Sequence, residues 1–170
     1  GMFSGCQALK SLDLSTFSFE EVVNMSSLFS NCTSLTEVKF PESAPIPKVK
    51  SLESLFEGCV GLTSLSFTFK NAESLESISN LFSGCIALEK VDFPSFECKN
   101  CQMMDGMFSG CQALKSVDLS TFSFEEALNI SGLFSQCTNL TEVKFPESAS
   151  IPKVKSLESL FEGCVGLTSL

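Results

Sequence analysis

The chain of 170 residues has no histidine, arginine, tryptophan or tyrosine, and all 11 of its basic residues are lysine. Without histidine, no Ser-His-Asp triad, Cys-His pair or histidine-ligated metal site can form. Without arginine there is no bidentate reader of phosphate or guanine, and the net charge of −9 repels nucleic acid. No apolar run reaches the ~18 residues of a membrane-spanning helix. We therefore expect no catalytic residues, cofactor, metal, nucleic-acid partner or membrane span.

The residues that are abundant, Phe, Leu, Ser and Cys, form a repeat. The string Phe-x-x-Cys-x-x-Leu occurs seven times, and its cysteines lie 26 or 27 residues apart. This period is typical of stacked leucine-rich repeats. The expected core ladder comprises Phe3, Cys6, Leu9, Phe29, Cys32, Leu35, Phe56, Cys59, Leu62, Phe82, Cys85, Leu88, Phe108, Cys111, Leu114, Phe134, Cys137, Leu140, Phe161, Cys164 and Leu167.

A longer unit of 105 residues, or four repeats, lies over the short one. Residues 1–65 align without a gap with residues 106–170, and 57 of the 65 positions are identical. We predict one solenoid domain over residues 1–170 that is a window on a longer array. The expected repeats are 1–26, 27–53, 54–79, 80–105, 106–131, 132–158 and 159–170.

The columns of the repeat predict the fold of each coil, counting from its cysteine as position zero. Apolar residues at −7, −4, −3 and 0 predict a short helical turn, with Asn or Ser at −8 as the N-cap. Position −1 is Gly in five of seven repeats, which predicts a left-handed residue there and strain at Gln136. Alternation at +5 to +8 predicts a strand, ended by Pro41, Pro94 or Pro146. The predicted fold class is an α/β repeat solenoid, a right-handed leucine-rich-repeat coil with a parallel β-sheet on one face and short helical turns on the other.

Two stretches carry a family resemblance. SLDLSTFSFEEVVNMSSLFSNCTSL at 11–35 and VDLSTFSFEEALNISGLFSQCTNL at 117–140 resemble the bacterial-surface-protein-A-like (BspA-like) leucine-rich repeats. The resemblance extends along the whole chain. It implies a protein that is extracellular or on the cell surface, similar in role to adhesins, and without catalytic residues.

The nine cysteines are expected to be free. Equivalent cysteines in stacked coils have parallel Cβ vectors about 5 Å apart, beyond the usual ~3.5–4.5 Å of a disulfide. Cys98 and Cys101 form the only Cys-x-x-Cys, and both occupy columns that are apolar in the other repeats. We expect core packing for both, with a local disulfide or a metal site as the alternatives.

Exposed residues of the strand column at +7 are candidate concave-face contacts: Asp13, Lys39, Asp92, Asp118 and Lys144. Asp13 should pair with Lys39, and Asp118 with Lys144. Asp92 beside Asp118 is either tolerated surface charge or a cation or ligand contact. The chain has four Asn-x-Ser/Thr sequons, and we expect their asparagines to serve as caps and turn residues. The alternative is N-glycosylation, for which Asn139 is the candidate acceptor.

Two functions remain open on the sequence. The first is a structural repeat protein, a segment of a long extracellular or surface array that assembles with copies of itself, end to end or laterally, into a filament or layer. The alternative is a cell-surface adhesion module that binds a host or matrix protein on its concave face.

Overall fold

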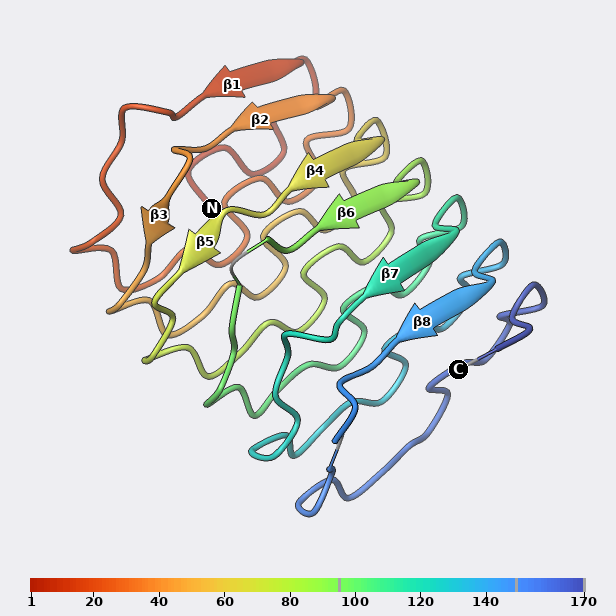
Figure 1. Cartoon of the computed structure of the whole chain (residues 1–170). Helices are drawn as coiled ribbons and strands as arrows, with labels where there is room; N and C mark the ends of the chain where they lie inside the picture. Colours follow the sequence, from red (N-terminus) through yellow and green to blue (C-terminus); the bar gives the residue numbers. More distant parts are fainter. Residues whose placement is uncertain (95, 149, 170) are drawn as a thin grey trace.

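The computed structural model describes residues 1–94, 96–148 and 150–169 as coils of chain stacked along one axis (Figure 1). Each coil is called a rung below and is named by its ladder cysteine. Three-residue strands lie side by side and point the same way (Figure 1). They are β1 (Ser11–Asp13), β2 (Glu37–Lys39), β4 (Ser64–Ser66), β6 (Lys90–Asp92), β7 (Ser116–Asp118) and β8 (Glu142–Lys144). The predicted solenoid with parallel strands is therefore confirmed.

The strands pair in register, parallel and two by two. β1 pairs with β2, β4 with β6, and β7 with β8. β2 and β4, and likewise β6 and β7, are in contact without belonging to one sheet. A second short parallel pair, β3 (Ala44–Pro45) and β5 (Phe69–Lys70), lies farther along two of the rungs. The middle residue of each major strand points into the core, as the alternating pattern predicts.

The ladder phenylalanines form one continuous stack through the core. Six successive ring pairs, from Phe3–Phe29 to Phe134–Phe161, have centroids 5.3–5.7 Å apart and planes within 14° of parallel. Phe40, Phe67 and Phe93 meet this stack edge-on from the strand side. Both geometries suit the aromatic quadrupole, and they tie each rung to its neighbour.

The predicted helical turns are wrong, because the described residues contain no helix. The amide of Cys32 does donate to the carbonyl of Phe29 three residues back. The amides of Phe29 and Asn31 instead donate to the carbonyls of Leu55 and Glu57 in the next rung. Along this face, one amide closes a β-turn within its own rung and the following amide bonds to the next rung. This face, a stack of β-turns, is called the turn ladder below.

A second left-handed column explains why the apolar spacing does not give a helix. Position −1 has positive φ in all seven rungs, including Gln136 at 62°, which confirms the predicted left-handed column. Position −5 also has positive φ, between 54° and 61°. Its residues are Ser27, Ser54, Asn80, Gly106, Gly132 and Ser159. Two left-handed residues within five cannot belong to a right-handed helix.

The predicted N-caps at position −8 do bind amides, but no helix follows them. The Asn24 side-chain oxygen accepts the Ser26 amide at 2.7 Å, and the Ser51 hydroxyl accepts the Glu53 amide at 3.1 Å. These bonds to the amide two residues on are Asx- and ST-type turns. The column also forms a line of parallel bridges through Asn24, Ser51, Ser77, Met103 and Asn129.

Substitutions at position −1 should separate backbone strain from packing. Gly110 has φ of 74°, and a Cβ added there would meet only ordinary contacts at 3.6 Å. We expect Gly110→Ala to lower the free energy of unfolding by about 1 kcal/mol. Gln136→Gly, in the same column, should raise that free energy by up to about 1 kcal/mol. Urea unfolding of both variants measures these changes, and equal effects of one sign would contradict strain as the cause.

Candidate functional site

Six of the seven ladder thiols donate a hydrogen bond to the rung before them. The thiol of Cys85 donates to the carbonyl of Phe56 at 3.0 Å, and that carbonyl also accepts the amide of Cys59. The same bond, at 3.0–3.1 Å, is made by the thiols of Cys32, Cys59, Cys111, Cys137 and Cys164. All nine cysteines are free. The thiol column therefore holds rungs together through its neutral form.

Burial keeps these thiols protonated. It raises the pKa of Cys59 and of Cys137 to about 12, and it raises the pKa of Cys85 and Cys111 as well. Neighbouring thiols in the column oppose ionisation further, because two thiolates would repel. A protonated, buried thiol is a poor nucleophile and a poor metal ligand. The buried thiols of this column therefore lack the features of an active-site cysteine.

The Cys-x-x-Cys pair lies inside the same core. Cys98 and Cys101 are both fully buried. A hydrogen bond between the two thiols and their burial raise the pKa of Cys101 far above its ordinary value. Across residues 1–94, 96–148 and 150–169, no three Cys, Asp or Glu side chains come together as a metal site would need.

The candidate concave-face contacts lie exposed along the strand face, which is the surface formed by the outward residues of the six major strands. Asp13 and Lys39 are 3.8 Å apart, and Asp118 and Lys144 are 3.0 Å apart. Asp92 pairs with Lys90 of its own strand at 2.9 Å. The two neighbouring aspartates thus each have a lysine partner. Exposed pairs of this kind contribute little to stability, about 0–1 kcal/mol each.

A turn stabilises the ionised carboxylate of Asp118 and so lowers its pKa. Its carboxylate accepts the Ser120 amide at 2.8 Å, and this contact with Ser120 is the main reason that its pKa falls to about 2. The ammonium group of Lys144 lowers that pKa further. Asp13 repeats the arrangement with Ser15 at 2.8 Å, and its pKa is also lowered.

A groove of about 610 Å³ crosses the strand face where β6 and β7 lie in contact without sheet pairing. Its lining residues include Lys90, Asp92, Ser116 and Asp118. The structure thus brings two of the candidate contacts, Asp92 and Asp118, to one groove, which Ser66 of β4 also lines.

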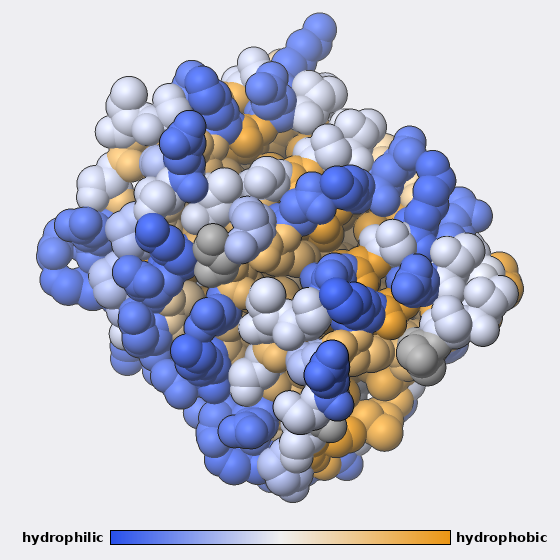
Figure 2. Space-filling model, in the orientation of Figure 1, coloured by the Kyte–Doolittle hydropathy of each residue, from blue (hydrophilic) through white to orange (hydrophobic). Residues whose placement is uncertain are grey.

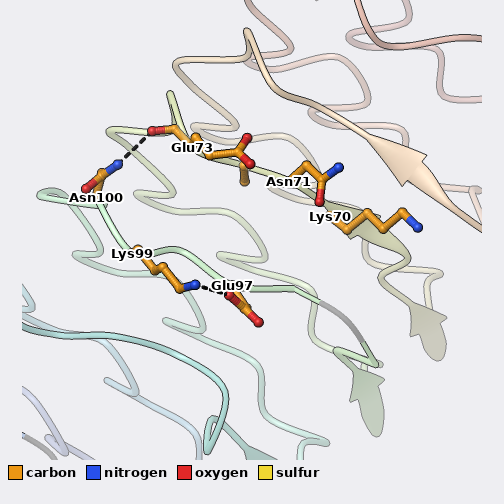
Figure 3. Close-up of a pocket in the computed structure, with 7 residues that line it drawn as sticks. Lys70, Asn71, Glu73, Glu97, Lys99 and Asn100 are labelled. Carbon is orange, nitrogen blue, oxygen red and sulfur yellow. Dashed lines mark hydrogen bonds and ion pairs between the residues drawn. The ribbon is translucent and has the colours of Figure 1, made fainter.

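The side of the solenoid below β5 carries a second groove, of about 380 Å³ (Figure 3). Lys99 pairs there with Glu97 at 2.7 Å, and the Asn100 amide group donates to the Glu73 carbonyl at 2.7 Å. Elsewhere on this side Lys48 pairs with Glu21 of the preceding rung. Two of the four charged residues that line this groove, Lys99 and Glu97, therefore neutralise one another.

Asn139 is exposed, next to the strand that begins at Glu142. The hydroxyl of Thr141, the third residue of its sequon, donates to the carbonyl of Lys115 at 2.9 Å. Asn24 and Asn129 each accept an amide two residues on. Glycosylation at Asn139 stays a prediction.

Residues 50–169, well over half of the chain, match the family described as "Mycoplasma protein of unknown function, DUF285". The chain belongs to the DUF285 family. Residues 1–73 of this DUF285 chain match the family "BspA type Leucine rich repeat region (6 copies)", which confirms the BspA-like resemblance. None of the curated proteins compared with it matches.

A solved structure supports the fold of the DUF285 chain. A leucine-rich repeat protein of T. pallidum has a TM-score of 0.50 and 24% identity, over 98% of this chain and 58% of that one. A leucine rich cell surface protein of Faecalibacterium prausnitzii has a TM-score of 0.48 and 22% identity, over 99% and 48%. The chain thus spans about half of the length of these proteins.

Removing one ladder thiol should cost stability in proportion to its burial. Cys85→Ala deletes a fully buried sulfur and its bond to the Phe56 carbonyl. We expect a loss of about 1–3 kcal/mol in the free energy of unfolding. Cys6→Ala is the matched control, since Cys6 is exposed. Chemical denaturation measures both, and equal losses would show that the thiol bond contributes nothing.

Acid should weaken the fold partly through Asp118. Its folded pKa of about 2 lies below the ordinary value, so its contribution is full above about pH 4 and is lost as pH falls toward 2. Asp118→Asn should therefore flatten the acid limb of stability against pH between those values. Lys144→Met should keep most of that limb, because Ser120 is the main cause of the lowered pKa. Unfolding curves from pH 2 to 6 test this, and identical limbs in both variants would contradict it.

Proposed function

We propose that the chain is a non-enzymatic structural repeat protein, a segment of a longer extracellular or surface array that self-assembles into a filament or layer. The observation that carries this is the direction of its strongest contacts. The phenylalanine stack, the thiol bonds and alternate amides of the turn ladder all link one rung to the next along a single axis. Such a molecule is built from nearest-neighbour contacts, which extend without limit when rungs are added.

Uniformity also favours a structural array. The 57 identities among 65 aligned positions repeat nearly the same surface every 105 residues. A lattice needs equivalent surfaces, whereas a binding site for one partner needs a distinctive one. Eight of the 11 lysines pair with an acidic side chain of the same chain, which leaves few cations for lateral pairing between arrays. Leucine-rich repeat proteins are in general non-enzymatic.

The second candidate is an adhesion module that binds a host or matrix protein across the strand face. The groove of about 610 Å³ between β6 and β7 favours it, because this groove hollows the strand face and presents Lys90, Asp92 and Asp118 together. A protein partner would then contact the column at +7.

Ligand-free assembly separates the two candidates. We expect the chain alone to form species larger than a monomer as its concentration rises, measured by sedimentation velocity. Electron microscopy of these species should show an axial repeat near ~20 Å, four strand spacings. A chain that stays monomeric at millimolar concentration would overturn the structural proposal. The strand face should then be tested against matrix proteins, with Asp118→Lys as the variant expected to abolish binding.

A further inference from the structure

We propose that the solenoid has a hinge after each of the strands β2 and β6, where the chain continues as Phe-Pro. At each hinge the strand face opens and closes, while the turn ladder holds the two rungs together. The junction between one rung and the next is called a step below, so the hinges lie at the steps from β2 to β4 and from β6 to β7. A hinge belongs to a single chain and does not depend on the proposed self-assembly.

Proline occupies position +9 in every second rung. The residues at +8 and +9 are, in chain order, Leu14-Ser15, Phe40-Pro41, Phe67-Thr68, Phe93-Pro94, Leu119-Ser120 and Phe145-Pro146. A proline restricts the backbone of the residue before it to extended conformations. That residue, at +8, carries the amide with which a strand reaches the next rung.

The +8 amides reach the next rung only where no proline follows them. Those of Leu14, Phe67 and Leu119 donate to the carbonyl at +7 of the next rung at 2.7–2.8 Å. The +8 amides of Phe40 and Phe93 make no such bond to any residue that the structure describes. The sheets follow the same alternation, because β1 pairs with β2, β4 with β6, and β7 with β8, whereas β2 and β4, or β6 and β7, do not pair. The steps are therefore closed and open in turn.

The other end of each strand alternates in the same way. At the three closed steps, the amide at +4 donates to the +4 carbonyl of the rung before, at 2.8–2.9 Å. These bonds run from Thr36 to Lys10, from Glu89 to Thr63 and from Thr141 to Lys115. Across the two open steps, the amides of Thr63 and Lys115 make no such bond within the described chain. Both ends of a strand are thus released together, so the whole strand face is parted at an open step.

The phenylalanine stack tilts at the same two steps. At the closed steps the ring planes lie 2–5° from parallel, in the pairs Phe3–Phe29, Phe56–Phe82 and Phe108–Phe134. At the open steps they lie 13–14° from parallel, in the pairs Phe29–Phe56 and Phe82–Phe108. A tilt between rungs in the core therefore accompanies each loss of strand pairing.

The step that follows β8 shows that Phe-Pro permits a closed geometry as well. Its rings, Phe134 and Phe161, lie 1° from parallel. The amide of Thr168 donates to the carbonyl of Thr141 at 3.3 Å, which is the bond that closed steps make at +4. The step from β2 to β4 has the same residue types at these positions one 105-residue unit earlier, and it is open. Phe-Pro is thus found in both geometries, as a hinge would be.

The turn ladder stays bonded at the open steps. The amide of Phe29 donates to the carbonyl of Leu55 at 3.0 Å across one of them, and that of Phe82 to Met107 at 2.8 Å across the other. The closed step from the Cys59 rung has the same bond, from Phe56 to the next rung at 3.0 Å. Because one face is held and the other is parted, the motion open to the two rungs is a rotation about the turn ladder. This rotation widens or narrows the strand face.

The open step from β6 to β7 coincides with the groove of about 610 Å³ on the strand face, which Phe93, Pro94 and Asp118 help to line. An amide without a protein partner needs water, and the groove admits water beside Phe93. Figure 2, in the orientation of Figure 1, shows orange hydrophobic surface between the blue and white side chains on the side that carries the strands. Closing the step would bring the Phe93 amide to the Asp118 carbonyl and narrow the groove. The hinge therefore sets the width of the groove.

Restoring a closed-step sequence tests the role of proline. Pro94→Thr gives the pair Phe-Thr that stands at residues 67 and 68 before a closed step. We expect the Phe93 amide then to donate to the Asp118 carbonyl, which slows its hydrogen–deuterium exchange about tenfold or more. NMR measures this rate residue by residue. Pro47→Thr is the matched control, because Pro47 lies away from the strand exits, and it should leave the Phe93 rate unchanged.

The reciprocal change should open a closed step. Thr68→Pro is expected to free the Phe67 amide from the Asp92 carbonyl and to speed its hydrogen–deuterium exchange about tenfold or more. The Thr68 hydroxyl also donates to the Pro41 carbonyl at 2.8 Å. Thr68→Val is therefore the control, since it loses this hydroxyl but has no proline, and its Phe67 rate should stay slow. Circular dichroism melts check that each variant is folded.

Relaxation-dispersion NMR on the monomeric chain distinguishes a hinge from a rigid gap. The amides of Asp92 and Asp118, on the two sides of an open step, should report motion between two conformations in microseconds to milliseconds, the range of collective hinge motions. The amides of Phe82 and Met107, in the turn ladder, should report none. Pro94→Thr should remove the dispersion at Asp92 and Asp118.

Each contrary result overturns a stated part of the proposal. In the unmodified chain, hydrogen exchange of the Phe40 and Phe93 amides as slow as that of Phe67 would overturn the open steps. Fast hydrogen exchange without relaxation dispersion would show a rigid gap and overturn the hinge. An unchanged Phe93 rate in Pro94→Thr would overturn proline as the cause. All of these measurements are made on single chains, so none of them decides whether the chain assembles.

Discussion

The alternation of backbone amides between their own rung and the next one is the constraint on which the rest of the structure depends. An amide that closes a turn fixes the shape of a rung, and the following amide fixes the distance to its neighbour. That distance brings the phenylalanine rings to 5.3–5.7 Å and each thiol to within reach of a carbonyl. A rung therefore reaches its final geometry only against another rung.

The identity of the ladder residues follows from this spacing. Phenylalanine supplies a flat face that stacks on an identical ring, and cysteine supplies a small, weakly polar donor that can be buried without ionising. Serine would be more polar, and alanine would leave one carbonyl lone pair without a partner. Because the rungs share their ladder residues, the ladder singles out no rung, and repetition characterises the core of the molecule.

The sequence predicts the parts of the fold that depend on alternation and on single residue types. The inward strand residues and the left-handed column at −1 are readable because a period of two and a recurrent glycine each have one structural meaning. The turn ladder cannot be predicted from the sequence in this way, because apolar residues three and four positions apart occur both in helices and in successive β-turns. The small polar residues at −5, such as Ser27 and Asn80, were the available signal. The carbonyls that accept the thiol hydrogen bonds could not be predicted, because the direction in which a carbonyl points is not encoded by residue type.

The hydrogen bonds between rungs run nearly along the axis of the stack, and this sets how the solenoid responds to tension. When such a coil is pulled by its ends, its bonds are loaded one rung at a time, as in a zipper, and not all together in shear. Each rung that opens releases 26 or 27 residues, or about 90 Å of extended chain. An array of such rungs held at both ends would lengthen stepwise under load and could close again rung by rung.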